Sequence, residues 1–390
     1  MREWKDAKTG RVVRQVTEEP EGASVGYFRV PRLLPDGRIL ASTRRDERHC
    51  LLAIDPETAS VEALSQDLSW PLRLRESDGT MWFFKPPPVE LPNKVARREY
   101  MKIHELVLCS VRLPDGKPDE IAVLPKDLPG SPADITCDGR TIILVRNEQD
   151  RDKYPIPFTK DAKTLWRYFN RPRRGTMWSY DLHTGRVVKM VHEEGVGLDH
   201  IDTSPTDPTL VRFCHDAFPG QRIWVVRTDG TGLRKIRPTD GDEVIVHEFW
   251  WPDGSLIAYK YQDRRNDPTL HEQPWGEYAP VPTQFGLADL EGRERYLSDA
   301  LNHYHSHIFV SKDTKYLCGE GTEISSHVCA ARFSTTSRRI KFVQMATIHT
   351  PYRPFGGQGV NSGFSADSRW LIYNDTVDGK RQVCAVRVDF

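Results

Sequence analysis

The sequence lacks any run of 18 apolar residues, any Cys-x-x-Cys spacing and any excess of one charge. Without such an apolar run, no transmembrane helix is expected. The 390 residues include 55 Lys and Arg and 55 Asp and Glu, and this balance argues against nucleic-acid binding, which needs a basic surplus. The first residues, Met1 to Asp6, are charged and lack the apolar stretch of a signal peptide. We therefore expect no nucleic-acid partner and no membrane partner.

The seven cysteines are an odd number, and most fall in strand-like apolar runs. These are Cys50, Cys109, Cys214, Cys318 and Cys384. Their spacing favours buried, reduced thiols over disulfides or a zinc site. A reducing cytoplasm is the simplest location, and a monomer or weak dimer is the expected oligomeric state.

What the sequence does contain is a repeat. Seven short acidic turns, each followed by an apolar strand, lie 42, 60, 69, 46, 60 and 54 residues apart. Their aspartates are Asp36, Asp78, Asp138, Asp207, Asp253, Asp313 and Asp367. Units of this length, rich in turns and β-forming residues, predict an all-β fold, a seven-bladed β-propeller that forms a single domain over residues 1–390.

The last repeat stops short at Phe390. Its missing outer strand is present at the other end of the chain, in residues 6–16. We expect this N-terminal strand to complete the last blade, since that removes an exposed sheet edge. Helical signals are scarce.

Two insertions interrupt the repeats, at residues 86–98 and 148–174. The second is rich in cations and aromatic residues, among them Arg167, Tyr168 and Arg171. One interpretation is a solvated loop. The other is a lid that binds an anionic sugar, because aromatic faces suit sugar rings and guanidinium groups suit carboxylates.

Residues capable of chemistry gather in the second half of the chain. His200, His247, His307 and Gln358 each lie shortly before an acidic turn, hence at the same place in four consecutive blades. Equivalent positions of successive blades converge on the propeller axis, so we expect these side chains to meet there. His215 and Arg222 lie close by in the sequence. His303, His305 and His307 alternate, which predicts one face of a strand, with His307 alone reaching the axis.

Several of these segments resemble the oligogalacturonate lyases, the seven-bladed propellers of polysaccharide lyase family 22. The most specific is His-Glu-Phe-Trp-Trp-Pro-Asp-Gly at residues 247–254. Phe-Cys-His-Asp at 213–216, Arg-Ile-Trp at 222–224 and Ser306-His307 are also similar, and the resemblance is strongest over about residues 165–320.

The resemblance implies β-elimination on short oligogalacturonides, with a divalent cation, manganese in the family, held by histidines and a glutamine. It implies His247 as the base, Arg222 as a substrate ligand and His307 as a metal ligand, with Gln358 as a further one. A base must remove the proton on C5 of the uronate, and His200 or His215 could then donate a proton to the leaving oxygen. Arg167, Tyr168, Arg171 and Arg222 are the expected substrate-binding residues.

The chain departs from the family just before the last turn. A His-x-His pair of the family is replaced by a segment that contains Gln358 and Asn361. Amide oxygens suit harder ions than imidazoles do, so the expected cation is calcium or magnesium in place of manganese, or none.

Two other functions remain open at this point. A non-catalytic propeller that binds sugars or proteins would be consistent with the missing imidazoles. A glycosidase would need a pair of carboxylates, for which Asp199, Asp216 and Glu248 are the candidates. The number of titratable groups at equivalent blade positions favours the lyase.

Overall fold

A computed structural model describes residues 2–27, 29–45, 48–65, 71–85, 100, 104–149, 171–215, 220–240, 242–265, 282–303, 305–321, 326–349 and 359–390. These residues form 29 strands in seven sheets, six of four strands and one of five. Seven small sheets of consecutive strands are the construction of a seven-bladed β-propeller, so the predicted all-β fold class is confirmed. In the described part of the chain, helical structure is limited to residue 100.

Contacts divide the chain into two compact units. Unit 1 comprises residues 1–86, 109–120 and 298–390, and unit 2 comprises residues 87–108 and 121–297. Two of the four boundaries fall inside strands, β9 (Leu106–Arg112) and β10 (Asp119–Leu124). The single domain expected over residues 1–390 stays a prediction.

Unit 1 contains three complete sheets. The first has the strands β3 (Ala23–Val25), β4 (Ile39–Arg45), β5 (Arg48–Asp55) and β6 (Ser60–Ser65). The second has β23 (His307–Val310), β24 (Tyr316–Glu320), β25 (His327–Arg332) and β26 (Val343–Thr347). The five-stranded sheet has β1 (Arg2–Lys5), β2 (Val12–Gln15), β29 (Lys380–Arg387), β28 (Trp370–Val377) and β27 (Gly363–Phe364), in that order. Strands β7 (Pro71–Arg75) and β8 (Thr80–Phe84) form a further sheet with β9 and β10.

Unit 2 contains the other three sheets. The first has β11 (Ser131–Ile135), β12 (Thr141–Gln149), β13 (Arg173–Asp181) and β14 (Val187–Glu194). The second has β15 (Leu198–Thr203), β16 (Leu210–His215), β17 (Ile223–Arg227) and β18 (Arg234–Lys235). The third has β19 (Glu243–Trp250), β20 (Leu256–Asp263), β21 (Gln284–Asp289) and β22 (Glu294–Leu297).

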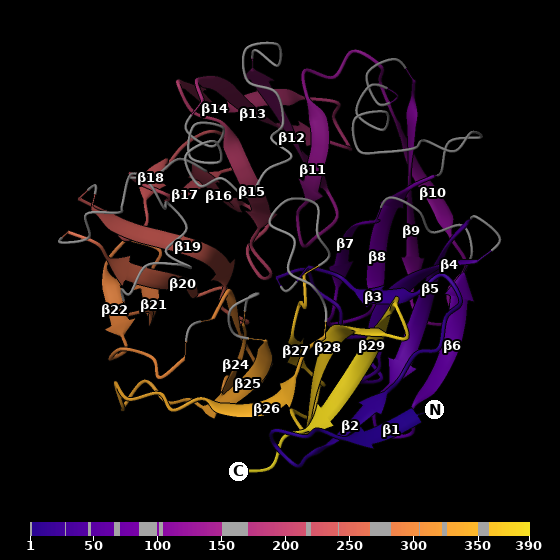
Figure 1. Cartoon of the computed structure of the whole chain (residues 1–390). Coiled ribbons are helices and arrows are strands. Elements are labelled where there is room, and N and C mark those ends of the chain that lie inside the picture. The colour runs from indigo at the N-terminus through magenta and orange to yellow at the C-terminus, as the bar shows by residue number, and fades with distance from the viewer. Residues whose placement is uncertain are drawn as a thin grey trace. The chain divides into compact units, whose positions relative to one another are not determined.

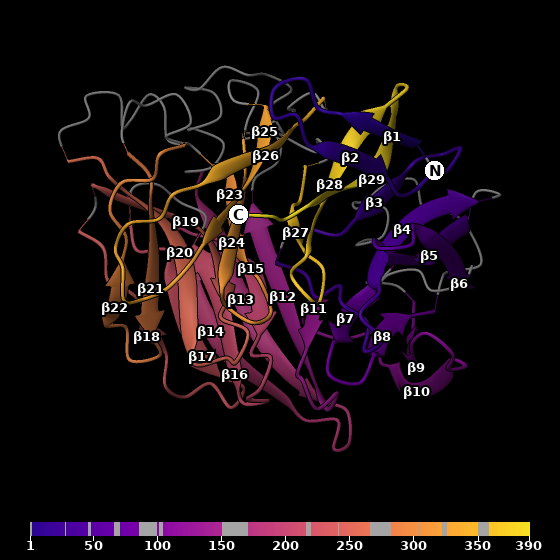
Figure 2. The same cartoon turned by 90° about the horizontal axis from the view of Figure 1, so that it is seen from below.

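The two ends of the chain share one sheet, as predicted. Strand β2 pairs antiparallel with β29, and β1 adds a fifth strand outside it. Figures 1 and 2 show the indigo β1 and β2 beside the yellow β28 and β29. Val13 of β2 is fully buried in a core cluster with Cys384 and Val386 of β29, so this closure is packed as well as hydrogen-bonded.

The acidic turns shape the repeat. In the turn before β20, the Asp253 carboxylate accepts a hydrogen bond from the backbone amide of Ser255 at 2.9 Å. Gly254 between them has a φ of 74°, which a residue with a side chain rarely adopts. Asp36, Asp78 and Asp367 accept the same bond from the residue two positions later. The aspartate and the glycine therefore fix the entry into the next strand.

Among the described residues, no helix is long and apolar enough to cross a bilayer. The seven cysteines are free, and six of them are buried, while their redox state stays a prediction. The cytoplasmic location stays a prediction.

Candidate functional site

The first strands of two neighbouring repeats in unit 2 carry the same irregularity. In β15 the register shifts between Asp199 and Asp202, and in β19 it shifts between Val246 and Phe249. The residues at the two bulges include His200, with a φ of 49°, and His247, with a φ of 56°. A left-handed backbone at a residue other than glycine costs about 1–3 kcal/mol and is concentrated at functional sites. Bulges also redirect side chains, so these two histidines are placed by a local distortion.

Glu248 is the centre of a buried charge network. Its side chain is 0% exposed. Oε2 accepts a bond from Arg222 Nε at 2.8 Å, and Oε1 accepts one from Arg212 Nη1 at 3.1 Å. Arg212 in turn donates to Asp202 at 2.9 Å. Burial alone would raise the pKa of Glu248, but the charges of Arg222 and Arg212, with the His200 hydrogen bond, hold it well below its usual range.

His200 connects this network to solvent. Its Nδ1 lies 3.2 Å from Glu248 Oε1 and 3.2 Å from Arg222 Nη2. Its side chain is 30% exposed, whereas those of Arg212 and Arg222 are buried. These two contacts to Nδ1 fix the orientation of the ring and leave Nε2 outside the network. We call Asp202, Arg212, Glu248, Arg222 and His200 the Glu248 network.

His215 lies next to this network at the end of β16. Its ring packs against Trp224 at 5.1 Å between centroids, and its backbone amide bonds to the Arg222 carbonyl. Burial, followed by the charges of Arg173 and Arg222, lowers the pKa of His215 to about 4. His215 is therefore neutral near pH 7.

Two more arginines of unit 2, Arg171 and Arg173, are also buried. Arg173 Nη1 donates to Asp199 at 2.8 Å, and Arg171 Nε donates to Gln149 at 2.7 Å. Of the three expected substrate-binding residues in the predicted lid, Arg167, Tyr168 and Arg171, only Arg171 falls within the described ranges. Arg167 and Tyr168 lie outside the described residues.

A second cluster lies in unit 1 around His307. Its Nδ1 contacts Glu320 Oε1, and its Nε2 lies 3.3 Å from the Tyr27 hydroxyl. The other oxygen of Glu320 accepts a bond from the Ser362 amide at 2.7 Å. The guanidinium of Arg32 donates to the carbonyls of Asn361 and Ser362 at 2.9 and 3.1 Å. We call Tyr27, Arg32, His307, Glu320 and Asn361 the His307 cluster.

Two groups of the His307 cluster are of kinds that bind divalent cations, the His307 imidazole and the Asn361 side-chain amide. The Glu320 carboxylate at Nδ1 of His307 is the partner that metal-binding histidines usually have, which leaves Nε2 for an ion. Asn361 Oδ1 is buried and accepts no hydrogen bond from any described residue, so an acceptor oxygen is available for a hard cation. The Tyr27 hydroxyl would have to leave Nε2. Gln358, the third predicted ligand, lies outside the described residues.

The predicted site residues occur in both units, and their convergence on one propeller axis stays a prediction. His200, His215 and Arg222 come together in unit 2, and His247 immediately precedes their partner Glu248. His307 and Asn361 belong to unit 1. The alternation of His303, His305 and His307 does not form one strand face, because β23 begins only at His307.

Sequence reasoning missed Arg212 and Glu320 and assigned no role in the lyase to Glu248. All three are buried polar side chains whose partners come from other parts of the chain. Glu248 stands in the motif at residues 247–254, so the motif contained a signal for it. Arg212 and Glu320 occur in mainly apolar strands. A charged side chain in such a strand was the sign in the sequence that a buried partner exists.

Seven small sheets define the class of seven-bladed β-propellers, and unit 2 adds a buried network of arginine, carboxylate and histidine side chains. The sequence model of the family described as oligogalacturonate lyase matches residues 109–267, which include the whole Glu248 network. An oligogalacturonate lyase from Dickeya dadantii (strain 3937) is 35% identical over 82 residues. An oligogalacturonide lyase from Pectobacterium atrosepticum is 37% identical over 82 residues. Each match covers 20% of this chain, and it spans only 21% of the length of the relative.

Solved structures extend the likeness to the whole fold. One is described as an oligogalacturonate lyase in complex with manganese, at a TM-score of 0.72 and 20% identity. Another is an oligogalacturonate lyase from Vibrio parahaemolyticus, at a TM-score of 0.73 and 17% identity. Both alignments cover 100% of this chain and 96% of the other chain. The chain is thus similar to the oligogalacturonate lyases in sequence over residues 109–267 and in fold over its whole length, which confirms the resemblance found in its motifs.

Proposed function

We propose that the protein is a lyase that cleaves short uronate-containing oligosaccharides, similar to oligogalacturonides, by β-elimination. The observation that carries this proposal is the buried contact of Arg222 with both Glu248 and His200. It combines a fixed positive charge with an orientated, partly exposed imidazole. The matching family segment, residues 109–267, contains all three residues.

The reaction requires three things of the protein. A base takes the proton from C5, next to the uronate carboxylate. The C5 electrons form a double bond to C4, and the bond from C4 to the glycosidic oxygen breaks with its electron pair on that oxygen. The developing charge on the carboxylate needs a cation or hydrogen-bond donors, and the leaving oxygen needs a proton.

We assign His247 as the base and Arg222 as the group that neutralises the substrate carboxylate. Glu248 holds Arg222 by its Nε, so the guanidinium is positioned before substrate binds. His200 is the donor to the leaving oxygen, because Glu248 orients its ring and its side chain reaches solvent. His215, with its pKa lowered to about 4, serves as a neutral hydrogen-bonding group beside Arg222.

Charge balance supports a need for additional positive charge. Within the described part of unit 2, Asp199, Asp202 and Glu248 are already paired with Arg173, Arg212 and Arg222. A substrate carboxylate would be an extra anion. Arg167, Tyr168 and Arg171 are proposed to contribute to its binding. A divalent cation held by His307, Asn361 and Gln358 would supply Lewis-acid stabilisation of a carboxylate.

The test is the release of unsaturated product from a panel of uronate oligosaccharides, followed by its ultraviolet absorbance. His247→Ala should lower the rate by at least about 100-fold, the usual size of a general-base contribution. His183→Ala is the matched control, since His183 is an exposed histidine of the same unit and should leave the rate unchanged. Full activity of His247→Ala would remove His247 as the base.

The same panel is run with and without EDTA. Loss of activity on chelation supports the cation, and activity that survives shows metal-free catalysis. No product from any uronide would contradict the lyase and favour a binding propeller.

A further inference from the structure

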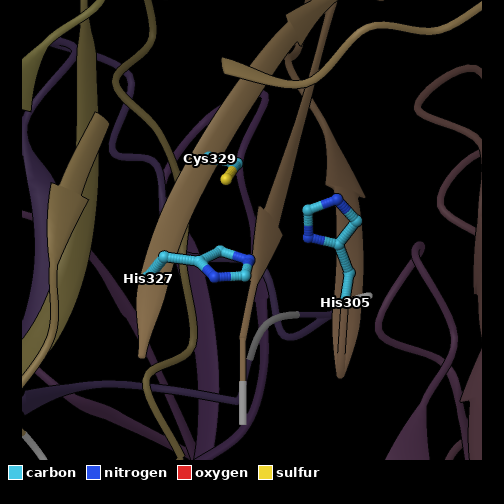
Figure 3. Close-up of side chains that lie close together, drawn as sticks. All are labelled: His305, His327 and Cys329. Atoms are coloured by element: carbon cyan, nitrogen blue, oxygen red, sulfur yellow. The ribbon is translucent and has the colours of Figure 1, made fainter. Parts of the chain in front are cut away.

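A third cluster in unit 1 contains two histidines and a cysteine. His305, His327 and Cys329 each offer a ligand atom, and these atoms lie within 4.8 Å of one another. Figure 3 shows the two imidazole rings pointing toward each other, with the sulfur beside them. His305 and Cys329 are 0% exposed and His327 is 3% exposed. Three groups that ligate metals therefore converge inside the protein.

The backbone makes room for this arrangement at Gly319. Gly319 of β24 pairs with Cys329 of β25, so it lies on the same face of the sheet. A Cβ atom at this position would lie 2.4 Å from His305 Nδ1, closer than real Cβ atoms approach. Its φ is not in the left-handed region, so backbone conformation does not require a glycine here. A glycine is required because the His305 ring occupies the space that a Cβ atom would take.

This cluster is separate from the His307 cluster. His307 pairs with Glu320, and Gly319 pairs with Cys329, and successive residues of a strand point to opposite faces. His327 and Cys329, two residues apart on β25, share one face. The two clusters therefore lie on opposite faces of the sheet formed by β23 to β26.

His303 is a candidate for the fourth ligand. The ring centroid of His303 lies 5.4 Å from that of His327 and 6.2 Å from that of His305. A tetrahedral zinc ion with bonds of about 2.0–2.3 Å keeps its ligand atoms about 3.3–3.8 Å apart. Small side-chain rotations would bring the three ligand atoms, now within 4.8 Å, to that separation.

We propose that His305, His327 and Cys329 form a site for a tetrahedral, borderline-soft metal ion, Zn²⁺ in preference to Mn²⁺, with His303 or water as the fourth ligand. One thiolate and two or three imidazoles are the donors that zinc prefers, while magnesium, calcium and manganese prefer oxygen. Because the ligands come from β25 and from the segment before β23, the ion links parts of one sheet. It acts as a structural ion and is independent of the proposed catalysis.

Binding must displace the thiol proton. A zinc ion takes the thiolate, and one proton leaves the protein for each ion bound. Zinc affinity should therefore rise with pH.

The experiment uses the full chain, stripped of metal with a chelator and titrated with Co²⁺ and then Zn²⁺. We expect one Co²⁺ per chain to give the visible bands of a tetrahedral complex and a sulfur-to-cobalt charge-transfer band. Zn²⁺ should displace the cobalt and raise the melting temperature. Absence of a tetrahedral cobalt spectrum in the wild-type protein would overturn the proposal, whatever the variants do.

Two variants and two controls locate the site. Cys329→Ser should abolish the charge-transfer band, and His327→Gln should weaken Zn²⁺ binding by more than about 100-fold. Cys50→Ser, a buried cysteine elsewhere in unit 1, and Asn361→Ala, in the His307 cluster, should leave the band unchanged. A band that persists in Cys329→Ser, or that is lost in Cys50→Ser, contradicts the assignment. Because the readout is spectroscopic, failure of the lyase proposal would not affect it.

Discussion

At the scale of single residues, Glu248 determines how unit 2 holds its positive charges. It neutralises Arg212 and Arg222, which are both buried, and it bonds to His200. A buried carboxylate with two guanidinium partners and a hydrogen-bonded imidazole is stable only as a complete set. Removing one member leaves uncompensated charge away from water.

Glu248→Gln is therefore expected to destabilise the protein by about 3–5 kcal/mol, since the amide keeps the volume but removes the charge between two arginines. Glu62→Gln is the control, because Glu62 pairs with Arg38 at the surface and such pairs contribute about 0–1 kcal/mol. The free energy of unfolding of both variants is measured by guanidinium denaturation. Equal effects of the two substitutions would show that the Glu248 network does not stabilise the fold.

In unit 2 the sequence indicated the histidines and Arg222, but it did not indicate the buried Arg212 that completes their network. His200, His215 and Arg222 were all named from the sequence; the structure places His200 in contact with the Arg222 side chain and bonds the His215 amide to the Arg222 carbonyl. Arg212 was not expected, because its neighbours in sequence are apolar and its partners, Asp202 and Glu248, lie on other strands. For the same reason the sequence did not indicate the cluster of His305, His327 and Cys329, in which no two ligands have a spacing typical of zinc motifs.

At the scale of strands, the pairing of β2 with β29 joins the chain ends. Val12 and Val13 are adjacent in β2 but face opposite sides: Val12 is 53% exposed, and Val13 is 0% exposed. Val13 contributes to a core cluster that includes residues of β24, β25, β28 and β29. The strand is thus held by a buried side chain as well as by its ladder.

Val13→Ala should lower the free energy of unfolding by about 2 kcal/mol, because two buried methyl groups are lost and a cavity is left. Val12→Ala has the same chemistry at an exposed position and should change it by less than about 0.5 kcal/mol. Thermal melting of both variants measures the difference. If the two melt alike, β2 is frayed in solution and does not complete the sheet.

Strand positions were predictable because the repeat marks them. Each acidic turn has its own local hydrogen bonds, such as that from Ser255 to Asp253, so sequence alone identifies it. The bulges in β15 and β19 were not predictable. Their left-handed histidines depend on contacts with other strands, and His200 and His247 look like ordinary strand residues in the sequence.

At the scale of the whole molecule, the chain order explains why both ends must be present. Unit 1 is built from three segments, and residues 121–297 of unit 2 are inserted between two of them. Its five-stranded sheet cannot form before residues 380–387 are available to pair with β2. Such distant contacts impose a large loop-closure cost and slow folding.

The sequence predicts one domain over residues 1–390, and its cooperativity can be measured with the buried thiols. Domain boundaries usually fall in exposed linkers, whereas two of the four boundaries here fall inside β9 and β10. We therefore expect Cys318 of unit 1 and Cys214 of unit 2 to become reactive toward a thiol reagent at the same guanidinium concentration. Peptide mass spectrometry separates the two, and Cys137, which is partly exposed, reports the reactivity of the folded state. Labelling of Cys214 at a concentration that leaves Cys318 protected, or the reverse, would show two domains that unfold independently.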